Sequence, residues 1–154
     1  MRVGNKPRVL VSLCLMGICC RYDGRANGCE GLDALMARCE LVPACPEQLG
    51  GLPTPRTPAE RRGGRVVTRD GADVTEAFRR GAAQACALAE RFGAKRALLK
   101  SKSPSCGARE IYDGTFTGTR VPGRGVAAEA LLAMEVSVYG EDEIDRLLAD
   151  LDDE

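Results

Sequence analysis

The sequence has no histidine and no tryptophan among its 154 residues, and its aromatic residues are three tyrosines and three phenylalanines. The absence of histidine excludes serine–histidine and cysteine–histidine catalytic pairs and every zinc site with a histidine ligand. Any acid–base step must therefore use a carboxylate, a lysine, a tyrosine or a thiol.

The chain also lacks an excess of charge of either sign and a long apolar segment. Its 22 basic and 22 acidic residues cancel, so no overall field draws it to nucleic acid or to an anionic membrane surface. No apolar run reaches the roughly 18 residues that a membrane-spanning helix needs. We therefore expect a small-molecule substrate, and neither nucleic acid nor membrane as a partner. Nothing in the sequence indicates the oligomeric state.

The N-terminal segment imitates a secretory signal, because basic residues precede the apolar stretch 9–20. Ser12 and Gly17 interrupt that stretch, however, and no small-residue cleavage pattern follows it. We therefore expect the protein to be cytoplasmic.

Eight cysteines are the most unusual feature that is present. They fit either a secreted disulfide scaffold or reduced thiols that bind a metal. A chain of this length buries a sufficient core without disulfides. The sequence thus favours reduced thiols and a single domain over residues 1–154, including an acidic C-terminal helix at about 141–151.

Apolar periodicity predicts an alternation of strands and helices. Strands are expected at 9–15, 41–45, 96–100 and 136–139, and helices at about 30–39, 73–93, 125–135 and 141–151. This pattern predicts an α/β fold, a three-layer sandwich with a mainly parallel, Rossmann-like or flavodoxin-like sheet, whose strand order the pattern does not give.

The longest predicted helix has the clearest boundaries. Asp73 and Glu76 are spaced as a capping box, and Gly93 is a stop signal. Its expected buried stripe is Val74, Phe78, Ala82, Ala85, Ala89 and Phe92.

Two segments between the predicted elements are expected to be loops. Prolines and glycines over 46–58 predict a long loop without regular structure, and residues 112–115 are typical of a turn between short extended segments. Arginines are frequent in the middle of the chain. They form either a solvated surface or a gate for an anionic or heteroaromatic substrate. They are Arg56, Arg61, Arg62, Arg65 and Arg69.

Three cysteines lie at or just beyond the carboxyl ends of predicted strands: Cys14, Cys45 and Cys106. The carboxyl ends of parallel strands meet at one edge of a sheet, so these thiols are expected to converge. Thiolates select iron–sulfur clusters, zinc or copper(I), and three ligands leave one metal position for a substrate. Either Cys19 or Cys20 could replace Cys14, whereas Cys39 and Cys86 are expected in the core and Cys29 has no assignable role.

Candidate acid–base groups lie beside these cysteines. Glu47 follows Cys45 by two residues and is either a base facing the same crevice or an idle, exposed loop residue. Ser101, Ser103 and Ser105 alternate before Cys106, so they either bind a polar substrate edge or stabilise a turn. No phosphate-binding glycine fingerprint is present.

Five motifs together resemble the thiouracil desulfurase family, formerly a domain of unknown function. They are Val-Ser-Leu-Cys-Leu-Met-Gly (11–17), Cys-Arg-Tyr-Asp-Gly (20–24), Val-Pro-Ala-Cys-Pro-Glu-Gln-Leu-Gly-Gly-Leu-Pro-Thr-Pro-Arg (42–56), Lys-Ser-Lys-Ser-Pro-Ser-Cys-Gly (100–107) and Ile-Tyr-Asp-Gly-Thr-Phe (111–116). The resemblance implies an oxygen-sensitive 4Fe-4S cluster held by Cys14, Cys45 and Cys106, with one iron free of protein ligands.

The resemblance also implies a reaction. The free iron acts as a Lewis acid on the thiocarbonyl of a thiolated pyrimidine such as 2-thiouracil, water attacks the carbon, and uracil and sulfide are released without redox change. Glu47 is then the general base and Ser103 a hydrogen-bonding or proton-relay group, with Ser101 and Ser105 as alternatives.

Two other functions remain open at this point. The same cysteines could form a non-catalytic iron–sulfur or zinc-binding module in which Glu47 is idle. The enzyme could also remove sulfur from another thiolated small molecule, such as a thiolated nucleoside or a sulfur donor.

Overall fold

A four-stranded parallel sheet forms the centre of the computed structural model, which describes residues 6–26 and 28–153. Its order is β2-β1-β5-β8, and every neighbouring pair is parallel. The strands are β2 (Glu40–Ala44), β1 (Arg8–Ser12), β5 (Arg96–Leu99) and β8 (Ser137–Gly140). The predicted α/β sandwich with a flavodoxin-like sheet is thus confirmed, because in chain order these strands lie second, first, third and fourth.

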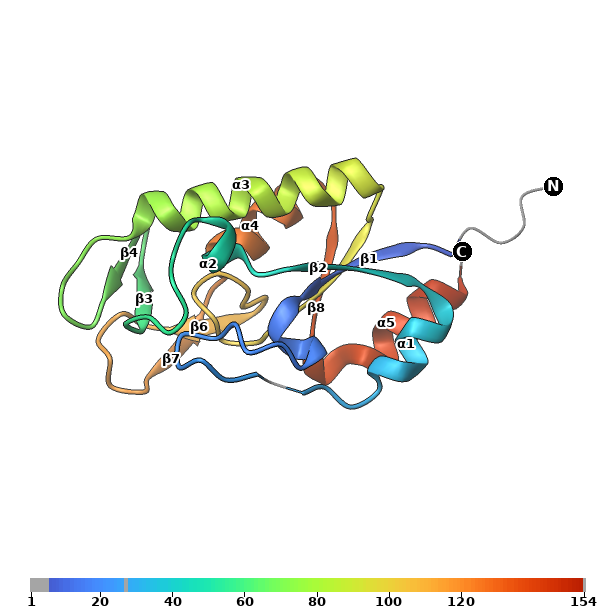
Figure 1. Ribbon diagram of the computed structural model, residues 1–154, viewed down its shortest axis with the longest axis horizontal. Helices are drawn as coiled ribbons and strands as arrows, with labels where there is room; N and C mark the ends of the chain where they lie inside the picture. The colour runs from blue at the N-terminus through green and yellow to red at the C-terminus, as the bar shows by residue number, and fades with distance from the viewer. Residues whose placement is uncertain (1–5, 27, 154) are drawn as a thin grey trace.

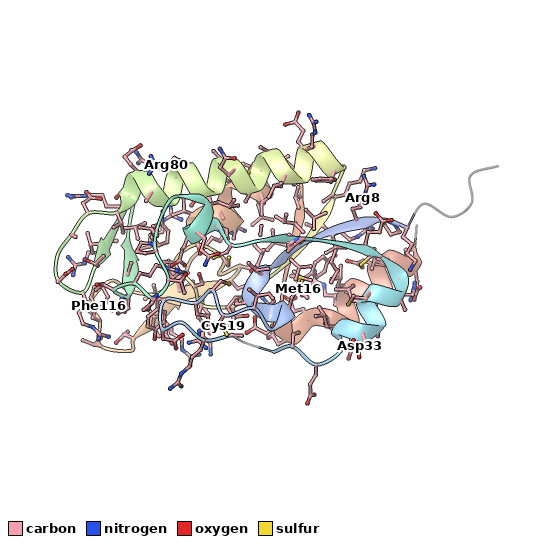
Figure 2. All side chains as sticks on the ribbon, in the orientation of Figure 1. Arg8, Met16, Cys19, Asp33, Arg80 and Phe116 are labelled. Atoms are coloured by element: carbon pink, nitrogen blue, oxygen red, sulfur yellow. The ribbon has the colours of Figure 1, made fainter. Side chains whose placement is uncertain are left out.

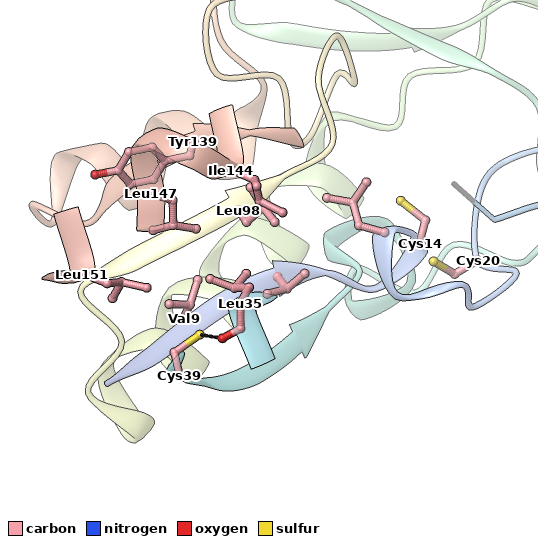
Figure 3. Packing of buried hydrophobic residues seen from close by; sticks show 12 residues of the cluster. Val9, Cys14, Cys20, Leu35, Cys39, Leu98, Tyr139, Ile144, Leu147 and Leu151 are labelled. Carbon is pink, nitrogen blue, oxygen red and sulfur yellow. Dashed lines mark hydrogen bonds between the residues drawn. The ribbon is translucent and has the colours of Figure 1, made fainter. Parts of the chain in front are cut away.

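Side chains of these strands alternate between the two faces of the sheet, so both faces are apolar. Helices cover each of the two faces (Figure 1). Val9, Val11 and Leu98 pack in one cluster with α1 (Leu32–Arg38) and α5 (Ile144–Asp152), as Figure 3 shows in part.

The opposite cluster contains Leu10, Ala97 and Leu99 together with residues of α3 (Thr75–Phe92) and α4 (Val126–Ala133). Small residues on α3 and α4 allow these two helices to lie side by side in this layer (Figure 1). No helix in the described part of the chain combines the length and apolar character needed to cross a membrane.

The strand predicted over 9–15 is too long. β1 ends at Ser12, and the short 3-10 helix η1 (Leu13–Met16) follows it. Leu15 is nevertheless almost fully buried, so apolar character continues past the end of the strand and does not mark it. The remaining predicted strands are shifted by one residue at most, and a second 3-10 helix, η2 (Glu141–Glu143), precedes α5.

The predicted capping box of α3 is wrong. The helix begins at Thr75, and its N-cap is Val74, which makes no side-chain cap hydrogen bond. Asp73, one residue before the N-cap, nevertheless accepts a hydrogen bond from the Thr75 backbone N–H at 2.9 Å, so its side chain does satisfy an amide at the start of the helix, while its other oxygen pairs with the Arg65 guanidinium. The stop at Gly93, in the left-handed conformation, is confirmed, but Phe92 is 42% exposed and does not belong to the buried stripe.

Two antiparallel hairpins were not predicted as strands. They are β3 (Ala59–Arg62) with β4 (Arg65–Thr68), and β6 (Glu110–Tyr112) with β7 (Arg120–Pro122). Both lie at the same end of the molecule, away from α1 and α5 (Figure 1). The Gly63-Gly64 pair between β3 and β4 is a tight-turn signal that would have indicated the first hairpin. The turn expected at 112–115 does join two extended segments.

A short helix, α2 (Pro46–Leu49), occupies the start of the segment predicted to have no regular structure. Proline at the first helical position is favourable, because its missing N–H needs no partner there. α2 contacts α3 backbone to backbone: a Cβ on Gly81 would clash with the Pro46 carbonyl, and a Cβ on Gly50 with the Ala77 carbonyl. This contact sets the position of α2 on the sheet.

Gly81→Ala therefore reverses the usual effect of replacing glycine in a helix. Helix propensity alone predicts stabilisation by about 1 kcal/mol, but overpacking against the Pro46 carbonyl is expected to lower the free energy of unfolding by about 1–3 kcal/mol. Urea denaturation followed by circular dichroism measures the change. Gln84→Ala, at an exposed position of the same helix, is the control, and a Gly81→Ala protein as stable as this control would contradict the close contact.

Candidate active site

The three cysteines that follow β1, β2 and β5 line one cavity of about 470 Å³. Cys14 lies in η1, Cys45 is the N-cap of α2, and Cys106 lies in the turn after β5. The cavity opens at the carboxyl edge of the sheet, beside the point where chain order reverses between β1 and β5. The structure thus brings together three residues that are distant in the sequence, at the edge where they were expected.

The turn that carries Cys106 is fixed by serine hydroxyls. Ser103 Oγ accepts hydrogen bonds from the backbone N–H groups of Ser105 and Cys106, each at 3.1 Å. Burial raises the pKa of the Cys106 thiol to about 12, against hydrogen bonds with Ser12 and Ser105 that lower it. The Cys106 thiol therefore keeps its proton at neutral pH, and a metal ion that binds this sulfur must displace the proton.

A fourth thiol, that of Cys20, adjoins the other three. Cys20 is 2% exposed, and Figure 3 shows it beside Cys14 at the end of β1. Burial and then the neighbouring thiols of Cys45 and Cys14 raise the pKa of Cys20 to about 12. Cys19 is exposed, so of the two adjacent cysteines only Cys20 lines the cavity.

The other cysteines lie elsewhere. Cys39 is buried in the core and its thiol donates to the Leu35 carbonyl at 3.2 Å (Figure 3). Cys86 is half-buried against the cluster on the α3 side. The prediction that Cys39 is a core residue is therefore confirmed, whereas Cys86 packs at the edge of the core. Cys29 donates to the adjacent Glu30 carbonyl at 3.5 Å.

Glu47 lies in α2 and is not an exposed loop residue, since its side chain is 15% exposed. Its Oε1 accepts a hydrogen bond from Arg56 Nε at 2.9 Å, and its Oε2 accepts one from Ser105 Oγ at 2.8 Å. Both carboxylate oxygens thus have a fixed partner, one charged and one a hydroxyl.

Arg56 is the most highly connected side chain of the cavity wall. Its guanidinium, on a side chain only 7% exposed, also donates to the Pro53 carbonyl at 3.0 Å and to Thr54 Oγ1 at 3.1 Å. A further bond, to the Cys20 carbonyl at 3.0 Å, joins this loop to the segment that carries the fourth thiol. The sequence analysis placed Arg56 in a cluster of arginines, as a solvated surface or as a gate, and did not predict this connection, although the residue ends the same proline-rich motif (42–56) that contains Cys45 and Glu47.

The three serines differ in their connections. Ser105 Oγ contacts Ser103 Oγ at 2.9 Å as well as Glu47, so hydroxyls form a chain from the carboxylate to Ser103. Ser101 also lines the cavity, but its N–H binds Glu141 at 2.7 Å and its hydroxyl lies beside Gly140. The geometry therefore sets Ser103 and Ser105 apart from Ser101.

Only two of the five clustered arginines reach the cavity, Arg56 and Arg69. Arg61 pairs with Glu129 at 2.6 Å, Arg65 pairs with Asp73, and Arg62 donates to the Gly114 carbonyl at 2.6 Å. Those three arginines hold elements of the protein together and do not form a gate.

Comparison with known proteins places this geometry in a family. The family model for 2-thiouracil desulfurase matches residues 9–143. The uncharacterized protein YbbK of Bacillus subtilis (strain 168) is 43% identical over 150 residues, which cover 91% of this chain and 99% of that protein. A solved structure described as the [4Fe-4S]-dependent thiouracil desulfidase TudS is 45% identical, with a TM-score of 0.91 over 96% of this chain and 99% of its own. The chain therefore belongs to the 2-thiouracil desulfurase family.

Proposed function

We propose that this protein is a [4Fe-4S]-dependent desulfurase, which converts a thiolated pyrimidine such as 2-thiouracil to uracil and sulfide. The observation that carries the proposal is the position of Glu47, hydrogen-bonded to Ser105 and facing the cavity that Cys14, Cys45 and Cys106 line. A carboxylate held beside three thiols fits hydrolytic chemistry at a metal centre better than metal storage.

The donor set fits an iron–sulfur cluster. Cys14, Cys45 and Cys106 supply soft thiolate ligands from three separate segments. Among the described residues, no three cysteine or carboxylate side chains are grouped closely enough to hold a single metal ion. An iron–sulfur cluster accepts one thiolate at each of several irons, so it does not require the three thiols to meet at one point. When bound, the cluster would supply an iron without a protein thiolate, as a Lewis acid for the substrate sulfur.

The side chains of the protein then perform the proton transfers. Glu47 accepts a proton from the attacking water, while Arg56 holds the other carboxylate oxygen and so fixes the direction of the reactive one. Ser105 and Ser103 extend from Glu47 along the cavity wall and can pass a proton to the substrate. Overall, the C=S bond is replaced by C=O, sulfur leaves as sulfide, and no electrons are gained or lost.

The cavity volume, about 470 Å³, is that of a small-molecule site. We place the enzyme in the cytoplasm as one domain, because its eight cysteines are free thiols and a thiolate-ligated cluster needs a reducing compartment. A small thiolated molecule is then the partner, with no role for nucleic acid or membrane.

The metal content tests the ligand assignment. Anaerobic reconstitution is expected to give about four irons and four sulfides per chain, and Cys106→Ser to lose them. Cys19→Ser, at an exposed position, is the matched control and should retain the cluster. Cys20→Ser is expected to retain it too, because the proposed ligands are the three cysteines that follow strands. Loss of iron in Cys20→Ser but not in Cys14→Ser would show that Cys20, and not Cys14, is the third ligand.

Glu47→Gln tests the base. The amide keeps the size of the side chain but cannot accept the proton, so kcat for sulfide release from 2-thiouracil is expected to fall by about 10²–10⁴-fold at unchanged iron content. Glu76→Gln, on a side chain that is 80% exposed, is the control. A Glu47→Gln enzyme with full activity would rule out the proposed base, and an inactive wild-type protein that holds a cluster would favour a non-catalytic module.

Alanine substitutions separate the serines. Ser103→Ala is expected to lower kcat by about 10²-fold, because it removes the end of the hydroxyl chain, and Ser101→Ala to leave kcat close to the wild-type value. Iron content is measured in parallel, since Ser103 also binds the Cys106 N–H. The reverse order of effects, with only Ser101→Ala impaired, would transfer the relay role to Ser101.

A further inference from the structure

Half of the aromatic residues of this chain line one cavity. Of its three tyrosines and three phenylalanines, Tyr22, Tyr112 and Phe116 border the space that the cysteines and Glu47 also border. In a chain with so few aromatic rings this concentration is not needed for the core, which contains mainly aliphatic residues and alanines.

Phe116 has an unusual backbone conformation. Its φ of 59° lies in the left-handed region, which costs energy for a residue with a bulky side chain. Two groups of β3 hold the loop in this conformation. Glu60 Oε1 accepts hydrogen bonds from the N–H groups of Gly114 at 2.9 Å and Phe116 at 3.1 Å, and Arg62 donates to the Gly114 carbonyl.

The ring of Phe116 is paired with a cation. The Arg69 guanidinium lies over it, 5.8 Å from the ring centroid, and both residues line the cavity. We call this pair the Phe116–Arg69 wall. An aromatic ring and a guanidinium are the two groups on which planar nucleobases stack.

We infer that the Phe116–Arg69 wall binds the planar ring of the substrate by stacking and thereby selects heteroaromatic thiones. This inference rests on the proposed function and specifies the substrate class of the same site. Tyr22 and Tyr112 border the same space, while β3 holds Phe116 in place through Glu60. The hydrogen bonds from the Gly114–Phe116 loop to Glu60, and from Arg62 to Gly114, thus keep the Phe116 ring at the cavity despite its strained backbone.

Steady-state kinetics of the cluster-loaded enzyme test this role. Phe116→Ala is expected to raise KM for 2-thiouracil about tenfold, as for one lost base–aromatic stack, with kcat nearly unchanged. Phe116→Leu keeps the apolar bulk without the ring and should resemble Phe116→Ala, whereas Phe116→Tyr should resemble the wild type. A wild-type KM in Phe116→Ala or in Phe116→Leu would overturn the inference.

The chain offers a matched control. Phe92 is also paired with an arginine, since the Arg8 guanidinium lies 5.6 Å from its centroid. That pair lies far from the cavity, because Figure 2 shows Arg8 and Phe116 at opposite ends of the molecule. Phe92→Ala should therefore leave KM unchanged. An equal rise in KM in Phe92→Ala and Phe116→Ala would mean that neither ring has a specific role, and would also overturn the inference.

A fluorescence measurement does not depend on turnover. Because the chain has no tryptophan, Phe116→Trp introduces a single indole at the wall and Phe92→Trp a single indole away from it. Titration of the cluster-loaded proteins with uracil should change the emission of Phe116→Trp saturably and leave that of Phe92→Trp constant, and no change in Phe116→Trp would contradict the wall. If the wild type releases no sulfide, the proposed function fails, and the fluorescence result alone decides the inference.

Discussion

The buried ion pair of Arg56 and Glu47 is the interaction on which the geometry of the cavity depends. Its side chains are only 7% and 15% exposed, so both charges have lost most of their water. Such a pair is stable only when further hydrogen bonds satisfy the remaining polar atoms, and here Ser105 and the carbonyls of Pro53 and Cys20 supply them. The same bonds join α2, the proline-rich loop and the Cys20 segment, so one guanidinium aligns three parts of the wall.

The sheet provides the fixed base for this network. Chain order reverses between β1 and β5, so the segments that follow these two strands separate and leave a crevice at their carboxyl ends. Cys14 and Cys106 lie on the two sides of that crevice, while the close contact of α2 with α3 through Gly50 and Gly81 positions Cys45 and Glu47. Strand order and one helix–helix contact therefore bring the thiols and the carboxylate to one edge of the sheet, and the hydrogen bonds of Ser103 and Arg56 then fix the segments that carry Cys106 and Glu47.

The sequence predicted those parts of the structure that depend on continuous burial. Strands covered on both faces appear as apolar runs, and since Cys14, Cys45 and Cys106 each follow such a run, their convergence could be predicted. The hairpin strand β3 could not be found in this way, because its Ala-Glu-Arg-Arg sequence is stabilised by partners as distant as Gly114 and Glu129. The pairing of Arg56 with Glu47 was missed, and Cys20 could not be distinguished from Cys19, for the same reason: their positions depend on the path of loops, which no local sequence pattern records.

The lack of histidine, which at first only excludes mechanisms, also explains the form of the network. A carboxylate has two equivalent oxygens and no fixed direction of its own, whereas an imidazole has two distinct nitrogens. In this cavity the two oxygens of Glu47 are made different by their partners, because Arg56 occupies one and a serine hydroxyl chain begins at the other. The arginine thus fixes the orientation of the carboxylate, and the hydroxyls of Ser105 and Ser103 extend from its other oxygen. In the proposed reaction, proton transfer and ring binding therefore belong to different groups that line one cavity.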